Sequence, residues 1–162
     1  MTDNEIFAAG GFSGLAKILA PERVLILENS GKQGVLDALI DLFDDTPAVS
    51  SKSDLINGIY NREKLMSTGI GMSIAIPHVR LASINDICVA AAVVRNGVDD
   101  YESLDSQKVK LIFMIIAREN QHALHLRILA KLSSCLKTEA FRNKLINAAT
   151  PEDFYRLLTL GK

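Results

Sequence analysis

Two long apolar runs lie in the centre of the chain. Residues 87–94 and 109–116 are nearly continuous in apolar, largely β-branched side chains. This pattern is typical of strands that are covered on both faces of a sheet. Shorter apolar runs at residues 23–28 and 73–76 predict two further strands. Because helices must cover a sheet that is buried on both faces, we expect an α/β fold.

Apolar residues elsewhere recur with a period near 3.6, which predicts helices. After a short helical turn at residues 14–20, this spacing predicts helices at residues 32–43, 52–65, 121–136, 138–148 and 151–160. Thr150 is suited to cap the last of these, with Pro151 at its first position. The pattern therefore predicts a single domain, with a mixed β-sheet of about five strands sandwiched between α-helices.

The domain organisation is simple. Residues 1–13 show no clear period and include adjacent glycines, so we expect a flexible N-terminal arm there. Residues 14–162 contain no repeat, low-complexity tract or linker, and we expect them to form one domain. A chain of 162 residues with 48% hydrophobic residues is large enough to bury one core.

Charge and hydropathy exclude several classes of partner. The chain has 18 Lys and Arg against 19 Asp and Glu, so no strong field attracts nucleic acid or an anionic membrane. No apolar run approaches the roughly 18 residues that span a bilayer, and the acidic N-terminus is unlike a secretory signal. We expect a cytoplasmic protein without direct membrane insertion, in which Cys88 and Cys135 are reduced and buried.

The chain lacks the familiar motifs for binding cofactors. Ile74 occupies the third glycine position of a dinucleotide fingerprint, and Gln33 follows Gly31-Lys32 where a P-loop needs Ser or Thr. His122 and His125 could supply two zinc ligands from one helix, but the chain has neither an HExxH motif nor a Cys cluster. We therefore expect neither a cofactor nor a bound metal.

His78 is the first candidate for chemistry. It follows an apolar strand and Pro77, which should end the strand and leave the histidine at the end of the sheet, where sites gather in α/β folds. The alternative is a histidine that only caps backbone groups. Just before the strand, residues 68–71 supply a hydroxyl and two glycines whose backbone N–H groups could bind an anion.

Two further residues, His122 and Arg62, are candidates beside it. On a helical wheel His122 falls in line with Leu126 and Leu129, so we expect it to face inward from the first turn of its helix. There it is either a core residue or a ligand for an anion held at the helix N-terminus. His125 is expected to be peripheral. Arg62 is suited to phosphate, although arginines at helix ends are commonly only solvated.

Residues 62–78 read Arg-Glu-Lys-Leu-Met-Ser-Thr-Gly-Ile-Gly-Met-Ser-Ile-Ala-Ile-Pro-His. This segment resembles the signature of the enzyme IIA domains of the bacterial phosphotransferase system, mannitol/fructose class. The resemblance implies that His78 accepts a phosphoryl group from phospho-HPr, that His122 is the second active-site histidine, and that Arg62 lies near the acceptor. It extends over residues 14–160, so we expect no IIB or IIC segment. Met72-Ser73 stands where the family commonly has Asn-Gly, which leaves the contacts of this loop open.

The resemblance leaves two functions open. One is a phosphoryl carrier for sugar transport, with an HPr-like phosphocarrier as donor and a IIB protein as acceptor. The other is a regulatory protein of the nitrogen type, whose phosphorylation state controls protein targets. A metal-dependent hydrolase is a third alternative from a different class. The acidic residues Asp99, Asp100, Glu102 and Asp105 are expected in a solvent-facing loop, and Asp105 resembles the family's aspartate turn.

Overall fold

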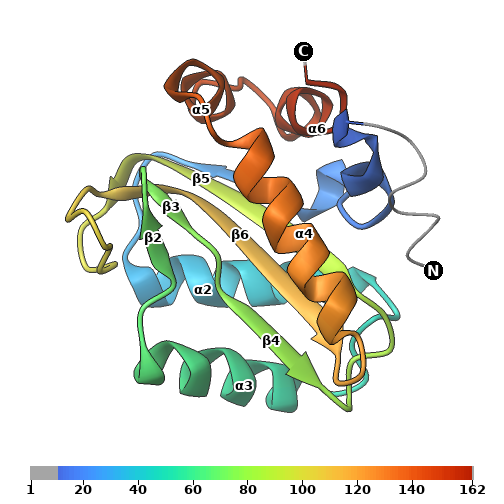
Figure 1. The fold of residues 1–162 in the computed structure, drawn as a ribbon. Helices are drawn as coiled ribbons and strands as arrows, with labels where there is room; N and C mark the ends of the chain where they lie inside the picture. Colours follow the sequence, from blue (N-terminus) through green and yellow to red (C-terminus); the bar gives the residue numbers. More distant parts are fainter. Residues whose placement is uncertain (1–10, 162) are drawn as a thin grey trace.

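The computed structural model describes residues 11–161 and shows one mixed sheet with helices on both faces (Figure 1). Within these residues the sheet has six strands. They are β1 (Val24–Leu27), β2 (Gly69–Gly71), β3 (Ile74–Ala75), β4 (His78–Leu81), β5 (Cys88–Val98) and β6 (Val109–Arg118). The predicted α/β fold with a mixed sheet between helices is confirmed.

The predicted helices are also present. The structure contains α2 (Lys32–Asp41), α3 (Lys52–Leu65), α4 (His122–Cys135), α5 (Glu139–Ile146) and α6 (Pro151–Leu160), with 3-10 turns η1 (Gly11–Lys17), η2 (Pro21–Arg23) and η3 (Leu42–Asp45). The side chains of Ser51, Thr138 and Thr150 cap α3, α5 and α6 by accepting backbone N–H groups. Most of the predicted arm, residues 1–10, lies outside the described residues, and η1 begins at Gly11.

The sheet order β1-β5-β6-β3-β2 places β6 at the centre. β5 is antiparallel to β6, whereas β3 and β4 both run parallel to it, one after the other. Figure 1 shows α4 on one face of the sheet and α2 and α3 on the other. Each face has its own apolar core, and both cysteines are buried, Cys135 in one core and Cys88 in the other. None of the helices described is long and apolar enough to cross a membrane.

The break between β3 and β4 corrects one prediction. His78 follows the short apolar strand β3 and Pro77, as predicted, but the ladder does not stop there, because His78 is the first residue of β4 and pairs with Ile115. Pro77 lacks only its own N–H, and its carbonyl still accepts the N–H of Ile115 at 3.0 Å. The ladder on β6 therefore resumes one residue later. His78 lies at this break in the ladder, on a strand whose one partner among the described strands is β6.

A hairpin that the sequence pattern did not predict precedes this break. β2 pairs antiparallel with β3, and the turn between them places Met72 and Ser73 at positive φ of 56° and 64°. Two consecutive left-handed residues are typical of a type I′ turn, which favours Asn-Gly. Asp105 stabilises this turn by accepting the Met72 N–H at 2.8 Å. The turn is therefore preserved without the residues that usually form it.

Candidate functional site

His78 faces α4 from the start of β4. Side chains alternate along the strand, so Val79 is buried in the core on the α3 side while His78 and Arg80 share the opposite face. The Nδ1 of His78 donates to the carbonyl oxygen of Ile76 at 2.8 Å. A carbonyl can only accept, so Nδ1 is the protonated nitrogen of the neutral ring. The other ring nitrogen, Nε2, keeps its lone pair free.

The surroundings favour this neutral ring. Burial lowers the pKa of His78, and the charges of Arg62 and Arg80 lower it further, against the opposing effects of the Ile76 carbonyl and Glu63. A histidine whose pKa lies below its ordinary value of 6.5 is neutral at pH 7. His78 therefore presents an uncharged nitrogen that can act as a nucleophile.

His125 packs directly against His78. Their ring centroids are 5.0 Å apart with an interplanar angle of 74°. His125 is 4% exposed, and its Nε2 has no hydrogen-bond partner among the described residues. Burial, together with the smaller electrostatic effects of the neighbouring His78, Arg80 and His122, lowers the pKa of His125 to about 4. Buried polar atoms in proteins are normally hydrogen-bonded, and a ligand bound at the site would give this nitrogen a partner.

The predicted orientation of the two α4 histidines was wrong. His122 is exposed, and its Nδ1 accepts from the guanidinium of Arg80. The face of α4 that points inward consists of Leu124, His125, Ile128, Leu132 and Cys135. Leucines occur on all sides of this helix, so a spacing of 3.6 fits more than one stripe. Leu126, which had aligned with His122, is 52% exposed.

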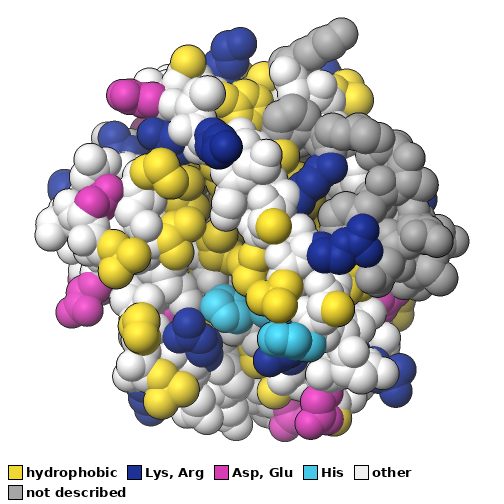
Figure 2. Space-filling model, in the orientation of Figure 1, with side chains coloured by type: hydrophobic (Ala, Val, Ile, Leu, Met, Phe, Trp, Pro, Cys, Tyr) yellow, Lys and Arg dark blue, Asp and Glu magenta, His cyan; other side chains and the backbone are white. Residues whose placement is uncertain are grey.

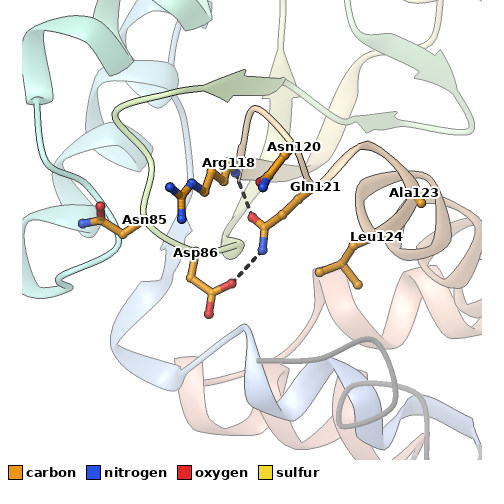
Figure 3. A pocket seen from close by; sticks show the side chains of 7 residues that line it. All are labelled: Asn85, Asp86, Arg118, Asn120, Gln121, Ala123 and Leu124. Atoms are coloured by element: carbon orange, nitrogen blue, oxygen red, sulfur yellow. Dashed lines mark hydrogen bonds between the residues drawn. The ribbon is translucent and has the colours of Figure 1, made fainter.

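A polar pocket beside the first turn of α4 shows how this helix is held in register (Figure 3). The side chain of Gln121 accepts the Arg118 N–H at 2.8 Å and donates to Asp86 Oδ1 at 2.9 Å. The Gln121 carbonyl then accepts the N–H of His125 at 2.9 Å. Gln121 thus joins the end of β6 to the turn that presents His125. None of the seven residues that line this pocket lines the cavity beside His78.

Two guanidinium groups lie at the cavity beside His78. This cavity of about 420 Å³ is lined by Arg62, His78, Val79, Arg80 and Glu119. Half-buried Arg62 comes from the last turn of α3 and donates to the Met66 carbonyl at 2.8 Å. Figure 2 shows histidine side chains close together on this face, with Lys or Arg side chains next to them. The structure thus brings predicted Arg62 together with His78 and leaves predicted His122 at the rim.

Arg80 was missed by the sequence analysis, although a signal was available. His78 and Arg80 are two residues apart, and alternate residues of a strand share a face. Because Pro77 was expected to end the strand, the alternation of side chains was not extended beyond the proline. The charge of Arg80 lowers the pKa of both His78 and His125, which places it at the same site.

The loop before β3 is not the anion cradle that the sequence predicted. The N–H groups of Thr68, Gly71 and Met72 donate to side chains of the protein, namely Glu63, Ser103 and Asp105. Gly69 allows a close approach of backbone, since a Cβ there would lie 2.1 Å from the Glu102 carbonyl oxygen. The backbone N–H groups of this loop therefore contribute to the structure that surrounds the site and are not free to bind an anion. In the part of the chain that the structure describes, no group of three or more His, Cys, Asp or Glu side chains is arranged to hold a metal ion.

Acidification is expected to destabilise the fold through His125. The unfolded side chain titrates near 6.5 and the folded one near 4, so the unfolded state binds more protons between these values. The free energy of unfolding should therefore fall as the pH drops through this window, by about 2 kcal/mol between pH 7 and pH 5 from His125. Urea unfolding at both pH values measures the loss. The variant His125→Leu should lose about 2 kcal/mol less, and equal losses in the two proteins would contradict the assignment.

Comparison with known proteins gives a consistent family of matches. The sequence profile described as "Phosphoenolpyruvate-dependent sugar phosphotransferase system, EIIA 2" matches residues 17–160. The fructose-specific EIIABC component of Bacillus subtilis is 38% identical over 128 residues, which are 79% of this chain and 20% of that protein. A nitrogen regulatory protein of Pseudomonas aeruginosa is 30% identical over 145 residues, covering 89% of this chain and 94% of that protein.

Solved structures agree with these sequence matches. The nitrogen regulatory protein IIA-Ntr of Neisseria meningitidis has a TM-score of 0.81 at 29% identity, covering 90% of this chain and 99% of that chain. A chain in the complex of enzyme IIAMTL and phosphorylated enzyme IIBMTL from Escherichia coli has a TM-score of 0.72 at 20% identity, covering 88% and 97%. At that identity the second likeness concerns the fold alone.

Proposed function

Because the chain belongs to the EIIA 2 family of the phosphoenolpyruvate-dependent sugar phosphotransferase system, we propose that it is a phosphoryl carrier whose acceptor atom is Nε2 of His78. The observation that supports this role most strongly is the hydrogen bond from Nδ1 to the Ile76 carbonyl, which leaves Nε2 as the free nucleophile. The cavity beside this ring is lined by two guanidinium groups, which favour an anionic group.

The proposed reaction uses this geometry. The lone pair of His78 Nε2 attacks the phosphorus of a phosphohistidine on an HPr-like donor, and the donor's N–P bond breaks, returning its electron pair to the donor ring. The phosphorylated ring of His78 keeps its proton on Nδ1, which still donates to the Ile76 carbonyl. Arg62 and Arg80 offset the charge of the phosphoryl oxygens, since such transfers depend mainly on positioning and electrostatics.

We assign the second histidine role to His125 in place of His122. His125 packs on His78, and its buried Nε2 is unpartnered among the described residues. As a neutral donor, this nitrogen can form a hydrogen bond to a phosphoryl oxygen on His78. His122 lies at the rim and contacts Arg80, so its effect on transfer is indirect.

The rim of the site is suited to protein partners. Apolar side chains are exposed at the end of α3, on the β2–β3 hairpin and on α4; they are Leu65, Met66, Ile70, Met72 and Leu126. Figure 2 shows apolar side chains gathered beside the histidines on this face. Exposed apolar surface next to a reactive group favours docking of another protein. The partners we propose are an HPr-like donor and a IIB acceptor, the latter supported by the complex of enzyme IIAMTL with enzyme IIBMTL.

A regulatory role is the second candidate. Both the relative from Pseudomonas aeruginosa and the structure from Neisseria meningitidis are nitrogen regulatory proteins, and both are matched over most of their length. In this role phosphorylation of His78 would change which protein binds the rim. A transport carrier passes its phosphoryl group to a IIB protein, whereas a regulator binds a target in one phosphorylation state only. Two assays on one preparation distinguish the roles. One measures phosphoryl transfer to a IIB protein, and the other measures binding of a target protein to the phosphorylated and unphosphorylated forms.

Incubation with phosphoenolpyruvate, enzyme I and HPr tests the carrier function. We expect intact-mass analysis to show one added phosphoryl group, lost in acid and retained in base as a phosphohistidine is. A reaction without HPr should leave the mass unchanged. An unmodified protein in the complete reaction, with the chain folded and HPr itself phosphorylated, would contradict the proposal.

A further inference from the structure

Behind the site lies a buried acidic group that the proposed reaction does not use. Glu63 is 9% exposed, and among the described residues it is the only carboxylate buried to this degree. It follows Arg62 in the last turn of α3. A buried charge is costly unless it is paired and hydrogen-bonded. The partners of Glu63 therefore indicate what this position does.

Both carboxylate oxygens of Glu63 are engaged by Thr68. The Thr68 hydroxyl donates to Oε1, and the Thr68 N–H lies 3.4 Å from Oε2. The Tyr101 hydroxyl donates to Oε1 at 3.2 Å, and burial raises the pKa of this phenol, which keeps it a donor. Lys32 Nζ lies 3.0 Å from Oε2 and supplies the opposite charge. Thr68 is thus held at both its hydroxyl and its backbone.

Thr68 connects this carboxylate to His78. The Thr68 carbonyl accepts the N–H of Ile76 at 3.0 Å, which ties β3 to the segment that follows α3. The carbonyl of the same Ile76 accepts the Nδ1–H of His78 at 2.8 Å. The path from Glu63 to the reactive ring therefore has three hydrogen-bonded steps.

We infer that Glu63 is a positioning residue: by holding Thr68 it keeps the Ile76 carbonyl where it selects the His78 tautomer with a free Nε2. This inference rests on the proposed function, because a free Nε2 matters only if that atom accepts the phosphoryl group. The role differs from that of Arg62, whose guanidinium lines the cavity itself. The adjacent residues Arg62 and Glu63 thus act on the same site in different ways. Arg62 contributes positive charge to the cavity, and Glu63 acts on His78 through the hydrogen-bonded path.

A buried ion pair with a merely structural role would predict a change of stability alone. The test must therefore measure the tautomer of His78, which long-range ¹H–¹⁵N correlation spectra of the unphosphorylated protein report directly. We expect the wild type to show the Nδ1–H form. In Thr68→Val, which removes the hydroxyl, and in Glu63→Gln, whose amide has one acceptor oxygen in place of two, a substantial Nε2–H population should appear.

Two matched variants complete the experiment. Thr68→Ser keeps the hydroxyl and the N–H, so it should keep the wild-type tautomer. Tyr101→Phe removes a hydroxyl from the same cluster without interrupting the path, and should also keep it. Phosphoryl uptake from phospho-HPr should slow by about 10- to 100-fold in Thr68→Val and Glu63→Gln, since a misplaced nucleophile costs rates of this order. Uptake should be close to wild type in the two matched variants.

The outcomes separate the inference from the proposed function. An unchanged Nδ1–H tautomer in folded Thr68→Val and Glu63→Gln would overturn the inference, even if the wild type takes up phosphate normally. A tautomer shift in Tyr101→Phe as large as in Thr68→Val would also overturn it, since general loosening would then explain both. Failure of the wild type to accept a phosphoryl group would remove the proposed function, while the tautomer measurement would still show whether Glu63 positions the ring.

Discussion

Replacing His78 by glutamine is expected to abolish phosphoryl uptake while leaving the fold intact. Glutamine keeps a polar side chain of similar reach whose amide can donate to the Ile76 carbonyl, as Nδ1 does. It has no basic nitrogen, so no N–P bond can form. His125 cannot replace the nucleophile, because its ring is 4% exposed and covered by its neighbours. Intact-mass analysis after incubation with phosphoenolpyruvate, enzyme I and HPr measures the loss.

His122→Gln is the matched control for this experiment. His122 is exposed beside the same cavity and contacts Arg80, so its replacement removes an accessible imidazole without removing the acceptor. We expect this variant to take up one phosphoryl group, as the wild type does. A full phosphoryl group on His78→Gln would place the acceptor on another residue and would remove the basis of the mechanism.

Local patterns predicted most elements of the fold because their signals are contained within single segments. The continuous apolar runs became β5 and β6, and the cap at Ser51 begins α3 at the predicted residue. Two short strands were missed for physical reasons. β2 consists of Gly-Ile-Gly, in which two glycines of low strand propensity flank a single isoleucine, and its pairing with β3 completes it. β4 follows a proline, and only its pairing with β6 shows that the ladder continues.

The candidate site was predictable only in part. His78 and Arg62 belong to one continuous segment, so their resemblance to a known signature was visible in the chain. The orientation of α4 was not, because its leucines cover every side and the contact that decides the matter is with a residue on β4. The role of residues 68–71 was also misjudged. The N–H groups of Thr68, Gly71 and the following Met72 donate to Glu63, Ser103 and Asp105, and the pairing of distant side chains cannot be read from a local pattern.

Replacing each of the two α4 histidines by leucine is expected to have very different effects on the rate of phosphoryl transfer. His125→Leu should slow phosphoryl transfer by about 100- to 1,000-fold, the usual cost of losing one donor aimed at developing charge. Leucine is similar in volume to histidine, so the packing of α4 against its neighbours is largely kept while the Nε2 donor is lost. His122→Leu should change the rate by only a few-fold, because its ring lies at the rim and contacts Arg80. Single-turnover transfer from phospho-HPr, followed by rapid quenching, measures both rates.

The comparison is decisive because the two substitutions are chemically identical and lie three residues apart on one helix. Unfolding in urea at pH 7 should show that both variants remain folded, since replacement of a buried neutral histidine by leucine leaves no buried charge. If transfer slowed mainly in His122→Leu, with His125→Leu near wild type, the assignment from the sequence would stand and the packing of His125 on His78 would be only structural. The packing of the His125 ring on His78, together with its unpartnered Nε2, leads us to expect the opposite.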